Sequence, residues 1–384
     1  MIGSIGNPVI VDTDIEFSIK NVALFKPYSG QLSDTSYLLK YLIRASINLR
    51  EEAAGAVQSF VSLGVIRSYL MPIPPLAEQH RIVAKVDELM ALCDQLEAQH
   101  SNAAEAHEKL VSHLLGTITQ SQSADDFSAN WQRIAAHFDT LFTTEASIDT
   151  LKQTLLQLAV MGKLVPQDTN DEPASELLKR IQAEKAKLVA EGKIKKDKPL
   201  AAIANDEKPF ELPLGWAWLK LGDLFTFEYG DNLPADKRSN TGEYPVYGSN
   251  GIVGTHNISF VESPCIVIGR KGSAGALNLC QTHGCCVTDV AYYCIPPNMI
   301  DIRFSYKLLH TLGLDELGKG IKPGLNRNEA YELIVAIPPR SEQHRIVAKV
   351  DALMSLCDQL KTRITAAKQQ QQKLADVLVE QAVA

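Results

Sequence analysis

A glycine-rich loop with two adjacent cations is the segment of this sequence best suited to hold an anionic ligand. Gly269-Arg270-Lys271-Gly272-Ser273-Ala274-Gly275 follows the apolar run at 265–268. Glycine lets a backbone approach a phosphate closely, and arginine can grip a phosphate or a guanine edge with two parallel hydrogen bonds. The same composition is also typical of a surface hairpin. It is not a nucleotide-binding loop, because the chain contains no G-x-x-x-x-G-K-[ST] motif.

Two other segments place polar and basic side chains on predicted turns. Residues 244–252 carry Asn250-Gly251 at a turn, and residues 317–327 form a glycine-containing loop with three cations. Amide, hydroxyl and guanidinium groups can read base edges, whereas a β-turn and a solvated loop are the structural alternatives. The three segments together give the candidate DNA-binding residues Tyr247, Ser249, Asn250, Arg270, Lys271, Ser273, Lys319, Lys322, Asn326 and Arg327.

A cluster of thiols in the same region is a weak candidate for a metal site. Cys280, His283, Cys285 and Cys286 crowd together, and Cys294 follows. A structural zinc site takes about four ligands with characteristic cysteine spacing. The separation of Cys280 from Cys285 is long for a ligand pair, and Cys285 and Cys286 are too close for both to ligate well. The spacing therefore favours reduced structural thiols, and we expect no metal.

Neither acid–base pattern in the chain indicates catalysis. Glu78-Gln79-His80-Arg81 and its copy at 342–345 fall in the first turn of a predicted helix, where a carboxylate is favoured by the helix dipole. Asp171 with Glu191 and Lys193 mimics a nuclease set, but these residues lie on a predicted helix end and linker. The chain also lacks an Asn-Pro-Pro-Tyr-type methyltransferase segment. We therefore expect no catalytic residues and no enzymatic activity on this chain.

The element that must position these segments is a long helix that occurs twice. Residues 78–96 and 342–360 are identical at 17 of 19 positions, and each copy follows an Ile-Pro-Pro sequence. Apolar residues step by 4 and 3 along each copy, which is the spacing of a coiled-coil seam. The similarity of the seams favours antiparallel packing of one copy on the other, and the alternative is one long amphipathic helix buried locally in each of two domains. The predicted seam residues are Ile82, Val86, Leu89, Cys93 and Leu96, and Ile346, Val350, Leu353, Cys357 and Leu360.

The pattern of the whole chain predicts an α+β protein, with globular domains of mixed strands and helices joined by two long antiparallel coiled-coil helices. The predicted boundaries are 1–75 for a small mixed segment, 76–118 for the first long helix, 119–191 for a helical connector, 192–211 for a linker, 212–339 for a complete mixed domain, and 340–384 for the second long helix. Strands are expected near 21–25, 69–73, 217–221, 244–247, 264–268, 290–295 and 333–337, and shorter helices near 36–50, 131–142, 148–161, 175–190 and 305–312.

Composition limits the classes of function. The 384 residues are 45% hydrophobic, which is enough for two or three domains with real cores. No apolar run is long enough for a membrane helix, and seven cysteines without paired spacing indicate a reducing cytoplasm. The net charge of −7 is unfavourable for binding nucleic acid. Cations that contact DNA must therefore be concentrated on one face, or a partner must supply them.

The chain resembles the specificity subunit of Type I restriction–modification enzymes. The resemblance rests on Ile-Pro-Pro-x-x-Glu-Gln-His-Arg-Ile-Val at 73–83 and 337–347 and on Leu-Pro-Leu-Gly-Trp-Ala-Trp at 212–218. It also rests on Gly-Lys-Leu-Val-Pro-Gln-Asp at 162–168 and Asp-Glu-Pro-Ala-Ser-Glu-Leu-Leu at 171–178. The resemblance covers nearly the whole chain. A heptad helix that starts with Pro-Pro-x-x-Glu-Gln and is found twice is a specific signal.

The resemblance implies a bipartite DNA target. Two target-recognition domains would each read one half-site, and the two long helices would hold them apart and dock methyltransferase subunits. Those subunits would bring S-adenosylmethionine, and a restriction subunit would bring ATP and magnesium, so no cofactor is expected on this chain. The resemblance favours DNA contact for the loops at 269–275 and 317–327. The alternative is a coiled-coil interaction scaffold that has lost specific DNA recognition.

The duplication extends beyond the helices. Gly3-Ser4-Ile5-Gly6 resembles residues 272–275, and Tyr37-Leu38-Leu39 resembles the stretch from Tyr306. Residues 1–75 therefore look like the second half of a domain whose full version is 212–339, so we expect a chain truncated at its N-terminus. Unpaired strand edges in such a remnant would favour a homodimer.

Overall fold

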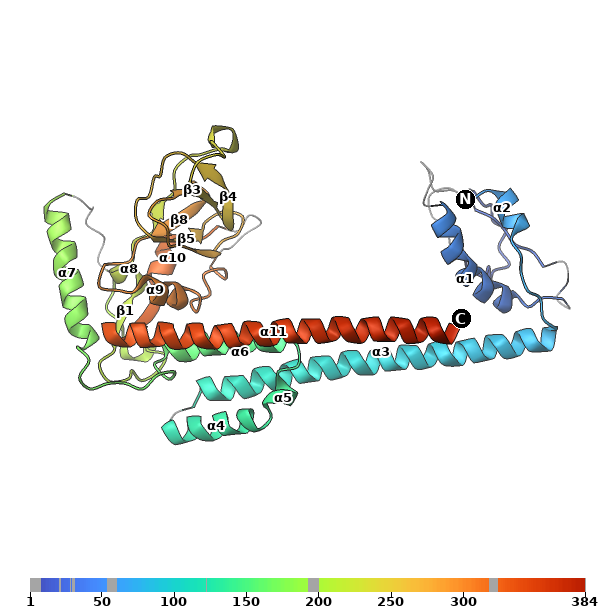
Figure 1. Cartoon of the computed structure of the whole chain (residues 1–384), viewed down its shortest axis with the longest axis horizontal. Coiled ribbons are helices and arrows are strands. Elements are labelled where there is room, and N and C mark those ends of the chain that lie inside the picture. The colour runs from blue at the N-terminus through green and yellow to red at the C-terminus, as the bar shows by residue number, and fades with distance from the viewer. Residues whose placement is uncertain are drawn as a thin grey trace. The chain divides into compact units, whose positions relative to one another are not determined.

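The computed structural model describes residues 8–20, 22–27, 29, 32–53, 61–121, 123–192, 200–317 and 324–383. The chain divides into two compact units, Met1–Ala106 and His107–Ala384, with the boundary inside a long helix (Figure 1). Within the described residues, no helix combines the length and the apolar character needed to span a bilayer. The predicted α+β class with two long helices is confirmed.

The first unit consists of helices in its described part. It contains α1 (Thr35–Ala53), α2 (Leu63–Ser68) and most of α3 (Leu76–Thr119). The strand expected at 69–73 is wrong, because this segment runs along α1 and gives its carbonyl groups to tyrosine side chains. The Tyr37 hydroxyl donates to Pro72 O at 2.9 Å, and the Tyr41 hydroxyl donates to Leu70 O. Residues 22–25 contain no strand either, and residue 21 lies outside the described residues.

The second unit begins with the end of α3 and a set of connecting helices. These are α4 (Ala124–Ala136), α5 (Phe138–Leu141), α6 (Glu145–Val160) and α7 (Ala174–Ala190). A capping box starts α6, in which the Thr144 hydroxyl accepts from Ser147 N at 3.1 Å. Lys163 donates to the carbonyl groups of Thr119 and Ser121 at 2.9 and 2.8 Å, so a cation meets the negative end of α3.

The mixed domain that follows contains three small sheets. Its elements are η1 (Asn205–Glu207), β1 (Ala217–Lys220), α8 (Leu221–Leu224), β2 (Glu228–Tyr229), η2 (Ala235–Lys237), β3 (Tyr244–Gly248), β4 (Gly251–His256), β5 (Cys265–Gly269), β6 (Leu277–Cys280), β7 (Cys286–Val287), β8 (Ala291–Cys294), α9 (Ile302–Leu309), α10 (Arg327–Tyr331) and β9 (Ile334–Ile337). The sheet orders are β1-β9, β2-β8-β5-β6 and β4-β3-β7. The expected strands of this domain are present, whereas β2, β4, β6 and β7 were not predicted.

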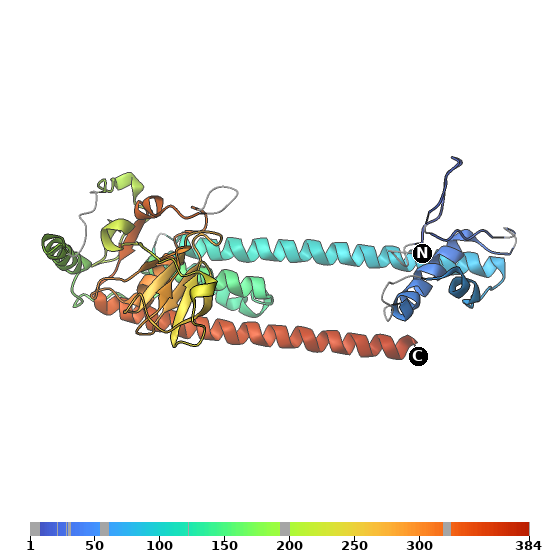
Figure 2. The same ribbon diagram turned by 90° about the horizontal axis from the view of Figure 1, so that it is seen from above.

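The second long helix, α11 (Arg340–Val383), is packed into this domain at its start (Figures 1 and 2). Ile346, Val347 and Val350 belong to the same buried cluster as Phe304 and Leu308 of α9. One to two turns further on, Cys357 joins a second cluster with α6 and with the end of α3. The members of that cluster are Val111, Leu115, Ile118, Ile134, Leu141, Phe142, Ile148, Leu151, Leu155, Leu158 and Cys357.

These contacts correct the predicted partners of the second seam. Ile346 and Val350 were expected to face the first long helix, but they are fully buried against the mixed domain. Leu353 and Leu360 are half-buried against the cluster that includes α6. The apolar stripe was read correctly as a buried face, and the sequence could not show which of several apolar elements covers it. Along α3, Ile82, Leu89 and Leu96 are exposed, and the antiparallel coiled coil stays a prediction.

A buried glutamine at the start of each long helix makes the same set of hydrogen bonds in both units. Gln79 Nε2 donates to Pro74 O at 2.8 Å, and Gln343 Nε2 donates to Pro338 O at 3.1 Å. Each glutamine oxygen accepts from the backbone N–H of an aspartate that caps a shorter helix, at 2.8 Å from Asp34 and 2.9 Å from Asp301. We call each set of bonds a glutamine clasp.

An ion pair is duplicated with each clasp. Lys40 of α1 lies 2.5 Å from Asp87 of α3, and Lys307 of α9 lies 2.5 Å from Asp351 of α11. The two helices α1 and α9 are therefore equivalent, as the duplication predicts. The hydrogen bonds correct the alignment by two residues, because Tyr37 N and Phe304 N are the groups that bond the capping aspartates.

Among the residues that the structure describes, the second copy carries contacts that have no counterpart in the first. Glu342 is buried and accepts from Trp216 Nε1 at 3.0 Å and from Gln167 Nε2 at 3.2 Å. Burial raises the pKa of Glu342, and these two hydrogen bonds oppose that rise. Arg345 donates to both carboxylate oxygens of Asp171. The Glu-Gln-His-Arg sequence thus fastens the mixed domain and the connector to α11, which supports its predicted structural use.

We predict that Gln343→Leu destabilises the second unit by about 2 kcal/mol or more. The substitution leaves the carbonyl of Pro338 and the N–H of Asp301 without their partner, and a buried unpaired polar group costs about 1–3 kcal/mol. Calorimetry of the full chain should show a melting transition lowered by several degrees. Gln359→Leu, on an exposed face of the same helix, is the matched control. Equal melting of the two variants would contradict the role of the clasp.

Candidate nucleic-acid interface

The three segments predicted to contact an anionic ligand lie next to one another and are joined by hydrogen bonds. Ser273 N donates to Ser249 Oγ at 3.2 Å, which ties the β5–β6 loop to the β3–β4 turn. Leu325 N donates to Arg270 O at 2.9 Å, and Lys271 forms a β-bridge with Gly324. The predicted loops are thus one continuous surface built from the ends of several strands.

Two guanidinium groups from separate loops stack on one exposed tyrosine ring. Arg270 Cζ and Arg327 Cζ each lie 4.8 Å from the centroid of the Tyr229 ring. Tyr229 is 48% exposed, so the cluster is open to solvent. Among the described residues, neither guanidinium lies within ion-pair distance of a carboxylate, although like charges held this close repel each other. We call Tyr229, Arg270 and Arg327 the arginine–tyrosine cluster.

The fold holds each member of this cluster by its backbone or by a carbonyl group. Tyr229 is on β2, whose pairing with β8 sets its ring edge-on to Tyr292 at 5.1 Å. Arg270 donates to Asp289 O at 2.9 Å, and Arg327, at the first turn of α10, donates to Phe227 O at 3.0 Å. Each guanidinium donates some of its N–H groups to a carbonyl oxygen and keeps its full positive charge. Such an arrangement is suited to binding an anion.

Glycine is required at the base of the basic loop. A Cβ on Gly269 would lie 2.0 Å from Ser273 O, and Gly275 has φ +77° and would place a Cβ 2.2 Å from Asp315 N. Larger residues at either position would push the β5–β6 loop off the neighbouring chain. The glycines therefore serve close backbone packing, which in turn fixes Arg270.

The predicted residues fall into three groups. Arg270, Arg327 and Lys271 are on the shared surface, with Lys271 and the side chains of Asn250 and Asn326 exposed. Tyr247 is not on it, because its side chain is 7% exposed and points into a buried cluster with Cys265 and Cys280. Lys319 and Lys322 lie outside the described residues.

Tyr229 was missed because a two-residue strand leaves almost no periodic signal in the sequence. The Phe-Glu-Tyr-Gly stretch at 227–230 has no turn motif and no basic neighbour. The only hint in the sequence was an aromatic residue placed before a glycine, Gly230. The backbone of Gly230 passes so close to Thr288 that a Cβ would lie 2.2 Å from Thr288 O. The pairing of β2 with β8 is a long-range contact that local patterns do not encode.

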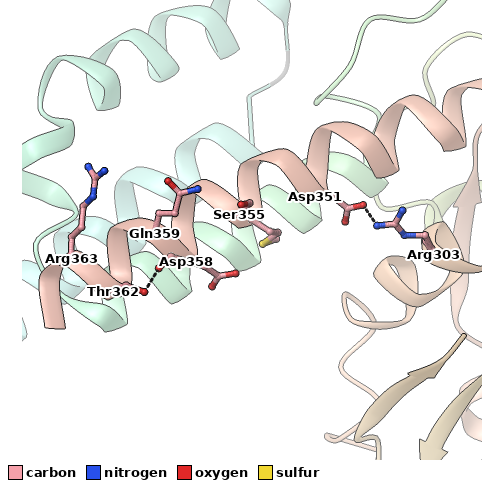
Figure 3. Close-up of a pocket in the computed structure, with 8 residues that line it drawn as sticks. Arg303, Asp351, Ser355, Asp358, Gln359, Thr362 and Arg363 are labelled. Carbon is pink, nitrogen blue, oxygen red and sulfur yellow. Dashed lines mark hydrogen bonds and ion pairs between the residues drawn. The ribbon is translucent and has the colours of Figure 1, made fainter. Parts of the chain in front are cut away.

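A polar hollow beside α11 is a structural joint between helices. It is lined by Arg303 of α9 and by residues on one face of α11, among them Asp351, Asp358 and Arg363 (Figure 3). Arg303 and Lys307 both pair with Asp351 across the two helices. Of the four charged side chains that line the hollow, Arg303 and Asp351 hold α9 on α11, and Asp358 pairs with Lys152 of α6.

The described residues of the nuclease-like set have structural roles. Asp171 of the nuclease-like set pairs with Arg345, and Glu191 caps the end of α7, while Lys193 lies outside the described residues. Three buried cysteines, Cys265, Cys280 and Cys285, bring their sulfur atoms within 4.8 Å of one another. This thiol cluster lies beneath the β3–β4 turn and includes no member of the arginine–tyrosine cluster.

Comparison with known proteins identifies relatives that are similar over most of this chain. The Escherichia coli "Type I restriction enzyme EcoAI specificity subunit" is 41% identical over 344 residues, covering 82% of this chain and 58% of the relative. The EcoEI specificity subunit of the same organism is 36% identical over 402 residues, covering 93% of this chain and 66% of the relative. The chain thus spans less than two thirds of the length of these relatives.

The fold also matches a solved structure. A chain from a study of complex assembly and conformational transition of the type I R-M system superposes with a TM-score of 0.50 at 18% identity, covering 91% of this chain and 71% of that one. At this level of identity the likeness concerns the fold.

A family model also matches most of the chain. The model described as "Type I restriction modification DNA specificity domain" matches residues 1–106 and 213–369, which include the described parts of both units that carry the glutamine clasps. The resemblance stated from the duplicated Pro-Pro-x-x-Glu-Gln motif is confirmed. This chain belongs to the Type I restriction modification DNA specificity domain family.

Proposed function

We propose that this chain is a DNA-recognition subunit that directs methyltransferase and restriction subunits of a Type I restriction–modification enzyme to a bipartite DNA target. The observation that carries the proposal is the arginine–tyrosine cluster, in which guanidinium groups from the β5–β6 loop and from the first turn of α10 share one exposed ring. In the proposal, residues 212–338 read one half-site. Membership of the specificity family and the names of the relatives support the same role.

The cluster has the chemistry needed for a DNA backbone and for a base edge. A guanidinium can hold two oxygens of a phosphate, or N7 and O6 of guanine, with parallel hydrogen bonds. The exposed Asn250 amide can pair with adenine in the same groove. The Asn326 amide caps α10, where its Oδ1 accepts from Asn328 N at 3.0 Å and its Nδ2 donates to Glu329 Oε1 at 3.3 Å. The net charge of −7 is compatible with this role because the cations Arg270, Lys271 and Arg327 lie together. Phosphate contacts by these cations would make binding salt-dependent.

The long helices suit the part of a spacer and docking surface. The structure gives α3 and α11 44 residues each, about 66 Å at 1.5 Å per residue. B-DNA advances about 34 Å per turn, so such a helix can bridge half-sites one to two turns apart. Exposed apolar residues such as Leu89, Leu96, Leu374 and Leu378 would contact methyltransferase subunits. In this proposal the chain is not itself an enzyme, the methyltransferase subunits carry S-adenosylmethionine, the restriction subunit carries ATP and magnesium, and the complex works in the cytoplasm.

We predict that Arg270→Ala combined with Lys271→Ala weakens DNA binding and flattens its dependence on salt. Each lost phosphate contact should reduce the slope of log affinity against log salt by about 0.9. A lost contact to a base should cost about 1–3 kcal/mol and relax specificity at that base. Binding is measured with the full chain assembled with methyltransferase subunits. Arg363→Ala on α11 is the control, because its exposed cation lies away from the loops. Unchanged binding by the double variant would contradict the assigned face.

We predict that Tyr229→Ala reduces specific DNA affinity about as much as loss of one guanidinium, roughly tenfold. The ring is the shared support of Arg270 and Arg327, so its removal releases both side chains. Tyr229→Phe keeps the ring and should keep most of the affinity. If the alanine variant binds like the parent, or if the phenylalanine variant is equally impaired, the ring does not orient the two arginines.

We also propose that two copies of the chain associate through the first unit. Val9, Ile15 and Leu70 are exposed there by 79%, 76% and 89%, and exposed apolar surface of this kind favours association. Light scattering of the full chain should give twice the monomer mass, and Ile15→Lys with Leu70→Lys should restore the monomer mass. A monomer at micromolar concentration would exclude the homodimer.

A further inference from the structure

The thiol cluster is assembled from three different parts of the mixed domain. Cys265 begins β5 and lies directly opposite Cys280 at the end of β6. The chain then turns at residues 281–284, and Cys285 returns to pair with Val261 through two backbone hydrogen bonds at 2.9 and 3.0 Å. All three side chains are buried, with exposed fractions of 1% or less. The cluster therefore joins elements far apart in the sequence.

The turn that brings Cys285 back depends on glycine. Gly284 has φ +129°, and a Cβ there would lie 2.5 Å from the ring of Tyr244. The segment between Cys280 and Cys285 seemed too long for a ligand pair. It folds back on itself at this turn. The third sulfur comes from the neighbouring strand, so the chain spacing alone did not indicate the cluster.

The distances between the sulfur atoms match those of a tetrahedral metal–thiolate site. Cys265 Sγ and Cys285 Sγ are 3.7 Å apart, and all three sulfur atoms lie within 4.8 Å of one another. Zinc–sulfur bonds are about 2.3 Å, which places two thiolates of a tetrahedron about 3.8 Å apart. All three cysteines are free thiols, so each can supply a ligand.

Polar groups surround the sulfur of Cys280. The Thr282 hydroxyl lies 3.2 Å from Cys280 Sγ, and Tyr247 belongs to the same buried cluster as the three cysteines. A purely apolar core would leave sulfur without such partners, whereas hydrogen bonds to ligand atoms are usual around bound metals.

We propose that Cys265, Cys280 and Cys285 bind one thiophilic metal ion, zinc by preference. The fourth position of a tetrahedral ion would fall to the Tyr247 hydroxyl or to a water entering past Thr282, which is exposed. Binding converts three thiols to thiolates and releases their protons, so affinity falls as pH is lowered. This proposal replaces the expectation, drawn from spacing, of reduced structural thiols without a metal.

A metal bound at the thiol cluster would stabilise the structure beneath the candidate interface. Cys285 is followed at once by β7, whose residues pair with β3, and Cys265 and Cys280 belong to the sheet that ends in Arg270. A metal at the thiol cluster would fasten the β4-β3-β7 sheet to the β2-β8-β5-β6 sheet beneath the surface formed by the β3–β4 turn and the β5–β6 loop. The proposal stands independently of DNA binding.

The test is direct measurement of metal in the full chain. Protein purified under reducing conditions without chelator should contain about one zinc per chain by elemental analysis. After the metal is stripped, titration with Cd²⁺ should produce sulfur-to-metal charge-transfer absorption that saturates near one equivalent. A parent chain that contains no metal and shows no such absorption overturns the proposal, whatever the variants do.

Substitutions locate the site. Cys280→Ala and Cys285→Ala should each weaken Cd²⁺ affinity more than about 100-fold, since even partners of ligands change metal affinity 10–100-fold. Cys294→Ala and Cys93→Ala are the controls, one buried and one exposed, and both should bind like the parent. A chelator should lower the melting temperature of the parent and leave that of Cys280→Ala unchanged. Equal binding by all four variants would assign the metal to adventitious sites and contradict the proposal.

Discussion

The glutamine clasp is the contact that fixes how the start of α11 meets α9, and the candidate interface is built on α9. Gln343 is fully buried at the start of α11, and its amide joins the proline carbonyl before the helix to the first turn of α9. A buried amide must be paired on both its donor and acceptor sides, so the clasp allows only one relation between the two helices. The chain makes the same clasp with Gln79, so the glutamine of the repeated Glu-Gln-His-Arg sequence has the same role in both copies.

The clasp connects the helix to the candidate interface through a short series of contacts. It fixes α9, whose Phe304 and Leu308 lie in the same buried cluster as Ile266 and Ile268 of β5. Arg270 directly follows β5, and the pairing of β5 with β8, and of β8 with β2, places Tyr229 beneath its guanidinium. A rigid helix can thus hold a DNA-reading face at a set position. In the proposed function this rigidity would fix the spacing between half-sites.

The fold was predictable where the sequence carries a repeated or periodic signal. The two long helices follow from a heptad pattern and from Pro75 and Pro339, and β5 follows from the apolar run at 265–268. Their partners were not predictable, because an apolar stripe does not specify what covers it: Ile346 and Val350 pack on the mixed domain. The segment at 69–73 has strand composition, but its carbonyl groups bond to tyrosine side chains and it is no strand.

The candidate site was predictable in part, because only some of its residues carry a local signal in the sequence. Arg270 and Arg327 stand in glycine-containing loops, which local composition reveals, whereas Tyr229 and the thiol cluster depend on pairing between distant strands. Both faces of β3 are covered, so Val246 and Tyr247 are buried in two different clusters, although Ser249 and Asn250 on the following turn are less buried. Side-chain direction on a short strand follows from its register, and that register is fixed only when its partners are known.

The central claim, that residues 212–338 read one half of a bipartite DNA site at a distance set by the long helices, is tested most directly by exchanging this domain. The segment would be replaced by the corresponding segment of the EcoAI relative, and the DNA methylated in cells by the assembled methyltransferase would be mapped. The account predicts that one half of the methylated sequence changes while the other half and the spacing between them are retained. Methylation of the parental sequence by the exchanged protein would contradict it.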